Sequence, residues 1–492
     1  MQILILIIYF LLVFFIGYVA SRRMHNAFDY LLGGRSFNSY ITALGAGASD
    51  MSGWLLLGLP GAVYISGLSE IWMPVGLIIG AYLNWLFVAK RLRIFSEITN
   101  NALTLPGYVS NRFCDRSGIL RLVMAITSLL FFTVYAASGL AAFALLFKVL
   151  FGLPYTAGLW FGLLSIFFYT YLGGFIAVNW IDVFQGSLML FALLIAPVAI
   201  WLHLHGAHEI TARLSALHIE YTNPLKGVGI ISFLSLLGWG FGYCGQPHIL
   251  VRFMAARSSK SISVAKNVCM VWMILCLIGA VLVGLFGAAL YVHAPLAKPE
   301  TVFLHTAVSL FTPAMAGILL AAVLSAIMST IAAQLLVCSS ALIEDIYLRF
   351  LAKKIRVKSE IKLNRIAVVI IALVALLLAL DPNNSVLTLV SYAWAGLGAA
   401  FGPVILLSLY WRRMSRNGAL LGMILGGVTV VLWRSLHVLG GVFELYELIP
   451  GFIVSSLGIY FGSIYDMQQN RLHQQVLQQY NKFIGQMKLF DR

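Results

Sequence analysis

The 492-residue sequence has few charged residues: Asp, Glu, Lys and Arg make up only 10% of it. A soluble protein carries about 25%. This scarcity, with 61% hydrophobic residues and a mean hydropathy of +0.94, excludes an ordinary soluble protein. Several apolar runs reach the ~20 residues that cross a bilayer core of ~30 Å as a helix. We therefore predict an all-α, polytopic integral membrane protein.

Catalytic and metal-binding motifs are also lacking. The five cysteines form no C-x-x-C pair, and an odd number without metal-ligand spacing argues against a disulfide framework or a zinc site. There is no G-x-S-x-G, H-E-x-x-H or Walker motif and no pair of carboxylates within one span. Nothing therefore supports an enzyme, and an ATP-driven pump would need a nucleotide domain that the chain lacks.

The apolar runs predict thirteen helical spans. They cover roughly 2–21, 38–63, 68–89, 119–147, 155–175, 182–203, 227–250, 264–292, 307–342, 364–380, 385–410, 417–438 and 446–465. With the N-terminus outside, all but five of the 32 Lys and Arg fall on the inner side; the five are Lys148, Arg213, Lys226, Lys298 and Arg434. By the positive-inside rule, this asymmetry predicts an outer N-terminus and an inner C-terminus. It explains the net charge of +15 without nucleic-acid binding.

No connection is long enough for a soluble domain, so residues 1–465 are predicted to form one membrane domain. Residues 466–492 form a polar, Gln-rich tail on the inner side. Val476, Tyr480 and Phe483 lie at helical spacing in this tail and predict a short amphipathic helix there.

Two spans are poor continuous helices. GAGASDMSGWLLLGLPG (45–61) has five glycines and a proline, and GWGFGYCGQPHI (238–249) has four glycines before Gln246 and Pro247. Glycine and proline weaken a helix interior, and such interruptions indicate discontinuous helices around a site at the membrane midplane. The two spans stand second and seventh, which suits two five-helix repeats over about 38–203 and 227–410.

Asp50 lies inside the first of these broken spans, although a carboxylate near the bilayer centre costs ~2.5–3.5 kcal/mol. A bare Na⁺ needs about five or six oxygens. We expect them from the carbonyls of Ala48 and Met51 and the hydroxyls of Ser329 and Thr330. Asp50 either ligates the cation or holds the broken helix open as a hydrogen-bond acceptor.

The hydroxyls of Ser329 and Thr330 share one predicted helix face with Ala326, at spacings i, i+3 and i+4. Such a pair is more often bonded back to its own helix carbonyls than used for a ligand. Both interpretations stay open at this stage.

Trp239, Tyr243 and Pro247 fall at i, i+4 and i+8 and predict one stripe on the second broken span. Such a stripe is either core packing or a surface that stacks on an apolar ring or attracts an ammonium group. The N-termini of half-helices suit a carboxylate, so a zwitterion with an apolar body fits between the broken spans.

Two further charges have a structural and a functional interpretation. Asp182 is expected at an inner helix end, interfacial and solvated, with a coupling role as the alternative. Arg35 is either a topological charge or a residue that closes the inner mouth by pairing with an acid.

Six segments in order, which are LLGGRS, GASDMSGWLLLGLPGAV, NNALTLPGY, GWGFGYCGQPHILVRFMAA, MSTIAAQLLVCSSALIED and LVSYAWAGLGAAFGPV, resemble the sodium:solute symporter family. The similarity runs from the first span to about residue 465. Within that family the resemblance is to bacterial inner-membrane members that import L-proline with Na⁺. It implies thirteen helices with a five-plus-five inverted-repeat core like that of the bacterial leucine transporter.

The resemblance also assigns roles to residues. It implies a sodium site on the carbonyls of Ala48, Met51 and Ala326 and the hydroxyls of Ser329 and Thr330. Asp50 is implied as the acid essential for sodium coupling. The residues implied for proline binding are Ser52, Tyr135, Trp239, Tyr243 and Pro247. Arg35 and Asp182 are implied in coupling and inner-side gating.

Two rival functions remain. One is a Na⁺-coupled symporter of another small organic solute, such as pantothenate or a different amino acid. The other is a transporter-like sensor or channel, although the short tail leaves no room for a signalling domain. Nothing in the sequence indicates an obligate protein partner.

Overall fold

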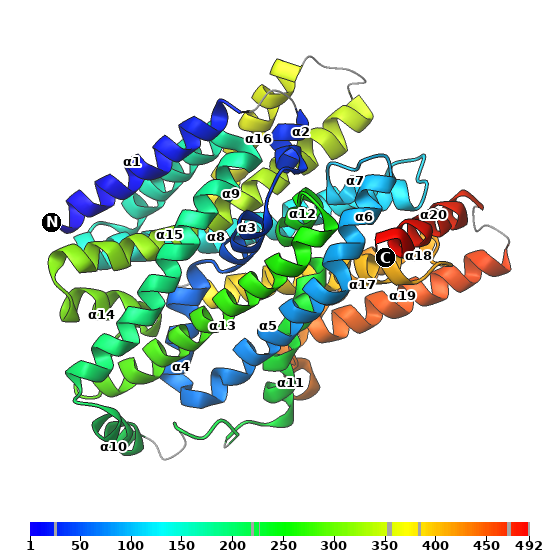
Figure 1. The fold of residues 1–492 in the computed structure, drawn as a ribbon. Coiled ribbons are helices and arrows are strands. Elements are labelled where there is room, and N and C mark those ends of the chain that lie inside the picture. Colours follow the sequence, from blue (N-terminus) through cyan, green and yellow to red (C-terminus); the bar gives the residue numbers. More distant parts are fainter. Residues whose placement is uncertain are drawn as a thin grey trace.

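The computed structural model describes residues 1–23, 27–217, 221–225, 227–351, 357–381, 385–469 and 474–490. Within these ranges the chain is helical, without a β-strand, and its one isolated bridge joins Phe37 to Ala256. The prediction of an all-α fold is confirmed (Figure 1).

Long helices make up most of the molecule. They are α1 (Gln2–Ser21), α5 (Trp72–Leu83) with η4 (Asn84–Ala89) and α6 (Lys90–Ile98), α8 (Ile119–Phe151), α9 (Tyr155–His203), α13 (Ser259–Leu290), α15 (Pro313–Ser340) with η7 (Ala341–Leu351), α16 (Val357–Leu378), α17 (Val386–Tyr410), α18 (Arg416–Leu436) and α19 (Leu448–Gln468). Among the described residues, ten helices are long and apolar enough to cross a membrane. They account for all the predicted spans except 38–63, 155–175 and 227–250.

Two of those three spans are broken helices, as their glycines and prolines predict. The first consists of α3 (Ser39–Asp50), η2 (Trp54–Gly58) and α4 (Leu59–Ser66). The second consists of α11 (Ile230–Gly238), η5 (Trp239–Gly245) and α12 (Pro247–Ala255). The interruptions shorten each regular segment below the length of a membrane-spanning helix.

Short elements connect the long ones. They are α2 (Ala27–Leu32), η1 (Gly33–Arg35), η3 (Gly67–Ile71), α7 (Leu105–Arg112), α10 (Ala207–Leu217), η6 (Pro299–Thr301), α14 (Val302–Leu310), η8 (His437–Leu439) and η9 (Gly441–Glu444). The tail forms α20 (Gln474–Phe490), in which Val476, Tyr480 and Phe483 are buried. The predicted amphipathic helix is thus confirmed.

Polar residues begin many of these helices. Asn38 accepts a hydrogen bond from the backbone N–H of Ile41, and Ser385 and Ser415 cap α17 and α18 in the same way. Ser258 and Ser261 form a reciprocal capping box at the start of α13. These caps satisfy amide groups that the first turn of a helix leaves unpaired.

Two predicted boundaries are wrong. Span 182–203 is predicted to start too late, because α9 breaks at Gly174, where φ is 50° and ψ is −159°, and its second part begins there. Only glycine adopts this conformation readily. The start of the predicted span 307–342 belongs to the separate helix α14, and Pro313 then opens α15. At Pro313 the apolar pattern continues through the break and conceals it.

The core is built around α15, which packs against α1, α3, α8 and α9. The broken helix α3 in turn lies against α9, α12 and α13. The first broken helix is therefore enclosed by protein, which is where interrupted backbone is tolerated in a membrane. In the second, η5 packs against α5 and α17.

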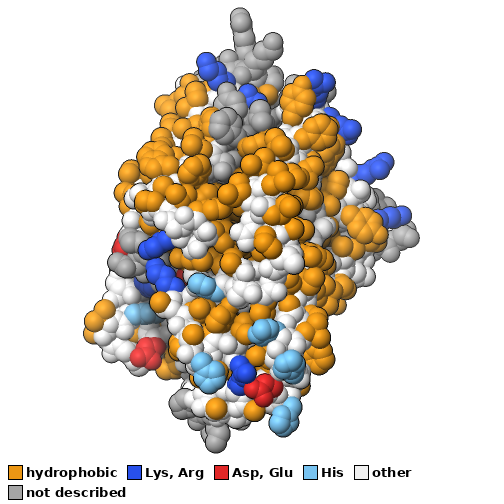
Figure 2. All heavy atoms as spheres, turned by 90° about the vertical axis from the view of Figure 1, so that its left-hand side faces the viewer, with side chains coloured by type: hydrophobic (Ala, Val, Ile, Leu, Met, Phe, Trp, Pro, Cys, Tyr) orange, Lys and Arg blue, Asp and Glu red, His pale blue; other side chains and the backbone are white. Residues whose placement is uncertain are grey.

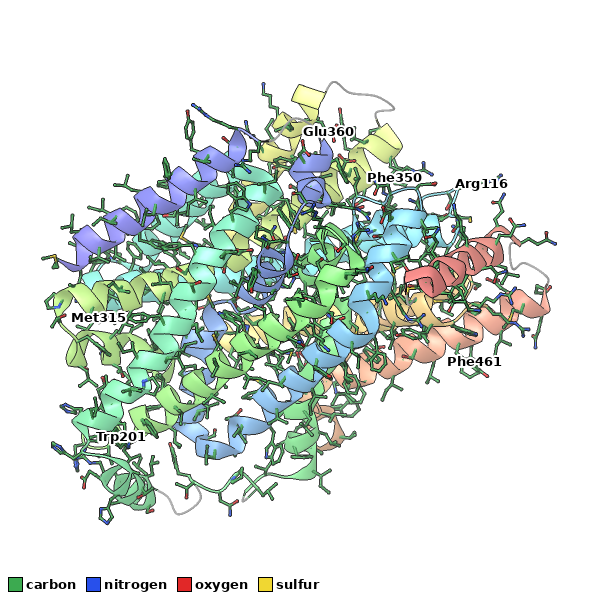
Figure 3. All side chains as sticks on the ribbon, in the orientation of Figure 1. Arg116, Trp201, Met315, Phe350, Glu360 and Phe461 are labelled. Atoms are coloured by element: carbon green, nitrogen blue, oxygen red, sulfur yellow. The ribbon has the colours of Figure 1, made fainter. Side chains whose placement is uncertain are left out.

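The outer surface is apolar around the middle. Figure 2 shows hydrophobic side chains over the centre of one face, with most Lys and Arg along its upper and right-hand edges and others at its left edge and lower end. Phe461 on α19, labelled in Figure 3, points away from the protein and is 62% exposed. Large exposed apolar side chains on membrane-length helices fit contact with lipid.

The connections between the long helices lie at two opposite ends of the molecule. Helices α6, α7 and α20, which lie in the predicted inner connection and tail, are at the upper right of Figure 1. Helix α10, which lies in a predicted outer connection, is at the lower left. Arg116, Phe350 and Glu360 lie towards the upper right in Figure 3, and Trp201 lies at the opposite end. This arrangement agrees with the alternation of connections that the spans predict.

Close helix packing at Gly279 gives a test of the fold. A methyl group there would collide with the carbonyl oxygen of Leu193 on α9, so Gly279→Ala should destabilise the protein by about 1–3 kcal/mol. At Gly427 the nearest atom to an added methyl is Ala400 Cβ at 3.9 Å. Gly427→Ala should therefore be neutral or slightly stabilising. Thermal unfolding of the detergent-solubilised protein measures both, and equal unfolding temperatures would contradict the packing.

Candidate functional site

The helix α3 unwinds directly after Asp50. Met51 has φ −81° and ψ 81°, and the N–H of Ser52 donates to Asp50 O at 3.0 Å. In a continuous α-helix that N–H would bond Ala48 O. The carbonyl of Ala48 is thereby released from helix hydrogen bonding, as the sequence predicts.

The released carbonyl faces α15. Ser329 Oγ donates to Ala48 O at 2.8 Å and to Ala326 O at 3.2 Å. Thr330 Oγ1 is buried without a hydrogen-bond partner among the described residues. The hydroxyl of Ser329 is thus bonded back to its own helix, as one of the two interpretations expects, and it also contacts the unwound carbonyl. Its use for a ligand stays a prediction.

These neutral oxygens fit a hard monovalent cation better than a transition metal. Carbonyl and hydroxyl oxygens are the ligands of hard cations. Among the described residues no group of three or more His, Cys, Asp or Glu could hold a metal ion. The structure brings Ala48, Ala326 and Ser329 into direct contact, with Met51 and Thr330 next to them along the chain.

Glycines allow α3 to approach its neighbours closely. A methyl group at Gly45 would collide with the side-chain amide of Asn179 on α9. At Gly47 it would lie 2.8 Å from the indole ring of Trp272 on α13. The glycines in this span therefore let α3 pack deep in the core, so that its unwound end reaches α15.

Asp50 connects the two broken helices. Its Oδ2 accepts a hydrogen bond of 2.6 Å from the hydroxyl of Tyr243 on η5, and its Oδ1 has no partner among the described residues. The side chain is buried. Of the two predicted roles for Asp50, this geometry supports the acceptor that holds the broken helix in place.

The second broken helix differs from its prediction. Trp239–Gly245 is a 3₁₀-helix, Gln246 is extended, and Pro247 opens α12. Residues at i and i+4 do not share a face of a 3₁₀-helix, which has three residues per turn. Trp239, Tyr243 and Pro247 therefore do not form the single stripe that α-helical spacing predicts.

Each of these three side chains has its own surroundings. Trp239 stacks on Tyr446 with ring centroids 5.2 Å apart, and Tyr243 meets Trp394 edge-on at 5.1 Å. Pro247 lines a separate small cavity that Asp345 also lines. Trp239 and Tyr243 thus remain near one another on η5, whereas Pro247 lies beyond η5, at the start of α12.

Sequence reasoning missed Trp394 on α17. Its indole N–H donates to Trp239 O at 2.9 Å, and its carbonyl accepts from Gln246 Nε2 at 3.1 Å. A methyl group at Gly242 would collide with this indole. Trp394 therefore holds η5 against α17 through these two hydrogen bonds. Nothing in its surrounding sequence distinguished it from a packing residue, since its partners lie about 150 residues away.

Tyr135 and Ser52 complete the predicted substrate set. Tyr135 on α8 is buried close to Ser52 and Trp54, and its ring lies 6.3 Å from that of His248. The hydroxyl of Ser52 accepts from the N–H of Trp54 at 3.4 Å. Tyr135 thus lies beside the unwound segment to which Ser52 belongs, and the role of both residues in substrate binding stays a prediction.

Arg35 lies close to a second contact between the two broken helices, where Phe37, ahead of α3, bridges to Ala256, at the end of α12. Its guanidinium lies 3.8 Å from Glu97 Oε2 on α6, and the same carboxylate oxygen pairs with Arg93 at 2.5 Å. The predicted pairing of Arg35 with an acid is thus present. Arg93 also donates to Ala256 O at 2.6 Å, so these charges join both broken helices to α6.

The expectation that Asp182 is interfacial and solvated is wrong. Asp182 is fully buried, and its Oδ2 accepts from Arg252 Nη2 at 2.9 Å. The helix after the break begins near Gly174 instead of at residue 182, so Asp182 lies about 12 Å inside it. Sequence reasoning missed Arg252, which lies on α12, the last part of the second broken helix.

Residues 30–426 match the model of the sodium:solute symporter family. The chain belongs to this family. Among its curated relatives, the sodium/proline symporters of Salmonella typhimurium and Escherichia coli are 51% and 52% identical to this symporter over 455 residues. Each alignment covers 91% of this chain and 90% of the relative.

Solved structures agree on the fold. A Na⁺-coupled sialic acid symporter, solved in a substrate-bound outward-open state, matches with a TM-score of 0.79. The match is 18% identical and covers 94% of this chain and 98% of that one. The symporter therefore has the inverted-repeat transporter fold with the second and seventh crossings broken. The boundaries of the repeats and of the 1–465 domain stay predictions.

The buried ion pair gives a test of this site. Arg252→Met should destabilise the symporter by about 3–5 kcal/mol, because it leaves the buried carboxylate of Asp182 unpaired. The double variant Asp182→Leu/Arg252→Met should recover much of that loss. Thermal unfolding in detergent measures the stability of the single and double variants. Strictly additive effects of the two substitutions would show that the pair does not interact.

Proposed function

We propose that this symporter imports L-proline together with Na⁺ by alternating access. The observation that carries the proposal is the contact of Ser329 Oγ with the released carbonyl of Ala48 and with Ala326 O. The sequence relatives named above supply the substrate, because their names specify sodium and proline.

Na⁺ would be bound by the carbonyls of Ala48, Met51 and Ala326 and the hydroxyls of Ser329 and Thr330. The unwound segment offers these oxygens without a helix hydrogen bond to break at Ala48. The hydroxyl of Ser329, now a donor to two carbonyls, would turn to accept the ion. Binding would pull α3 and α15 together at the midplane.

Proline would bind between the two broken helices. Tyr243 and Trp239 from η5, with Tyr135 and Ser52, offer aromatic surface and hydroxyls for a ring that carries an ammonium and a carboxylate. Asp50 would lie between the two ligands, since it accepts from Tyr243 and adjoins Met51. Ion binding at α3 would thereby set the position of Tyr243 in the proline pocket.

Release to the inner side requires separation of the broken helices at their inner ends. There the N–H of Arg257 donates to Phe37 O at 2.9 Å, and Arg93 holds Ala256 O. Arg35 and Asp182 would act in this gate through their partners Glu97 and Arg252. We place the N-terminus outside and the C-terminus inside a bacterial inner membrane, because the basic connections then face the cytoplasm.

Ser329→Ala tests both the function and the ion site. In proteoliposomes with an imposed Na⁺ gradient, uptake of radiolabelled L-proline should require Na⁺, and the variant should raise the half-saturating Na⁺ concentration about tenfold, or ~1.4 kcal/mol. Ser325→Ala is the matched control, one turn away and bonded to Ala321 O and Tyr9. Unaltered sodium dependence in Ser329→Ala would remove the proposed ion site. Absence of proline uptake by the wild-type symporter would remove the substrate.

Tyr243→Phe tests the link between the two ligands. The variant keeps the ring but deprives the Asp50 carboxylate of its only described hydrogen bond, a contribution of about 1.5–3 kcal/mol if Asp50 is ionised. Tyr9→Phe also removes a buried hydroxyl, one that contacts Gln185 and Ser325. Both variants should lower the unfolding temperature, but only Tyr243→Phe should raise the half-saturating Na⁺ concentration. Equal sodium dependence in the two variants would contradict the link.

A further inference from the structure

An apolar groove runs along the lipid-facing side of the second broken helix. Its walls come from Ile79, Leu83 and Phe87 on α5 and η4, Phe241 on η5, Leu406 on α17 and Phe452 on α19. These elements pack side by side (Figure 1). Phe241, Leu83 and Phe87 are 51%, 43% and 44% exposed, so the groove opens to the surroundings of the protein.

The length of the groove suits one leaflet of a bilayer. From Gly76 to Phe87, both of which line it, the helix rises about 16 Å. Half of a ~30 Å hydrocarbon core is about 15 Å. An extended acyl chain can therefore lie along the whole groove.

The inner end of the groove is capped by a cation. Phe87 and Leu406 line the groove, and the residues four positions after them, one turn further on each helix, are Arg91 and Tyr410. The guanidinium of Arg91 lies 4.0 Å from the centroid of the Tyr410 ring and donates to Leu409 O at 3.1 Å. The Tyr410 hydroxyl donates to Phe87 O at 2.9 Å, which fixes the ring there.

The charge at this end is positive. No ion pair between Arg91 and a carboxylate is found within the described ranges of the chain. Arg412 and Arg413, both exposed, lie two and three residues after Tyr410. An apolar slot that ends at unpaired guanidinium groups is complementary to a lipid with an anionic headgroup, since phosphate binds guanidinium through charge-assisted hydrogen bonds.

We propose that this groove binds an anionic phospholipid, with one acyl chain along α5, η5 and α19 and the phosphate at Arg91. On the proposed orientation of the chain the lipid comes from the inner leaflet. The bilayer surrounds the groove, so lipid is the occupant that is always present.

The site lies behind the proposed substrate pocket. The wall residue Phe241 belongs to η5, the 3₁₀-segment that also carries Trp239 and Tyr243. Phe241 contacts Phe452 across the groove, with ring centroids 5.2 Å apart. An acyl chain there supports η5 at Phe241, and its loss loosens the segment that holds Tyr243.

The first test is crosslinking by a phosphatidylglycerol with a diazirine in the middle of one acyl chain, in proteoliposomes of the full chain. Mass spectrometry should find adducts concentrated on residues 76–87, 234–244 and 445–452. Arg91→Gln should reduce these adducts at least threefold. Lys266→Gln, which removes a cation stacked on Tyr82 of α5 at 5.2 Å, is the matched control and should leave them unchanged.

A second variant acts on the chain instead of the headgroup. Leu83→Trp enlarges a half-exposed wall residue into the groove and should displace the acyl chain while Arg91 stays in place. Adducts that are equally abundant in Arg91→Gln, in Leu83→Trp and with a diazirine phosphatidylcholine would overturn the proposal and indicate ordinary annular lipid. Adducts spread evenly over the apolar surface would overturn it as well.

The effect on transport rests on the proposed function and is measured separately. Replacement of phosphatidylglycerol by phosphatidylcholine should raise the KM for L-proline at least twofold in the wild-type symporter and leave Arg91→Gln unaffected. Because crosslinking needs neither Na⁺ nor proline, a failure of the lipid site is distinguishable from a failure of the proposed function.

Discussion

The hydrogen bond between Tyr243 and Asp50 is the contact on which the organisation of the centre depends. It joins the two broken helices at the positions where each leaves regular helical geometry. A buried carboxylate without a donor is costly, and an unwound helix without partners is costly too. Each break offsets the cost of the other: α3 presents Asp50 and free carbonyls, while η5 presents the hydroxyl. Neither interruption would be stable alone in the core of a membrane protein.

The parts of this arrangement that follow from local chemistry could be predicted from the sequence. Glycine and proline mark both breaks, and Asp50, Ser329 and Thr330 are polar at a depth where polar groups are expensive. The parts that depend on exact backbone geometry could not. The stripe of Trp239, Tyr243 and Pro247 assumes α-helical spacing, whereas η5 has three residues per turn. Asp182 was misplaced because the second part of α9 begins directly at Gly174, and not at residue 182 as the predicted span does.

The continuous element formed by α5, η4 and α6 contacts the second broken helix, Arg35 ahead of the first broken helix, and the tail helix α20. Gly76 and Gly80 let α5 meet the backbone of Leu237 and Gly240 on the second broken helix. One turn further, Asn84 Nδ2 donates to Tyr243 O at 3.2 Å. At the inner end, Glu97 pairs with Arg35, and Phe95 stacks on Phe483 of α20 with ring centroids 4.2 Å apart.

This arrangement constrains how the second broken helix can move. Where two backbones meet through glycines there are no side chains to interlock, so η5 can slide along α5 at little cost. The bond from Asn84 to the Tyr243 carbonyl opposes such sliding, because its loss would leave a buried amide and a buried carbonyl unpaired. Tyr243 is thus held through its carbonyl by α5 and through its hydroxyl by Asp50. In the proposed mechanism, a change at the ion site would alter only the second of these restraints, so that Na⁺ binding would reposition the aromatic ring while the backbone stays in register.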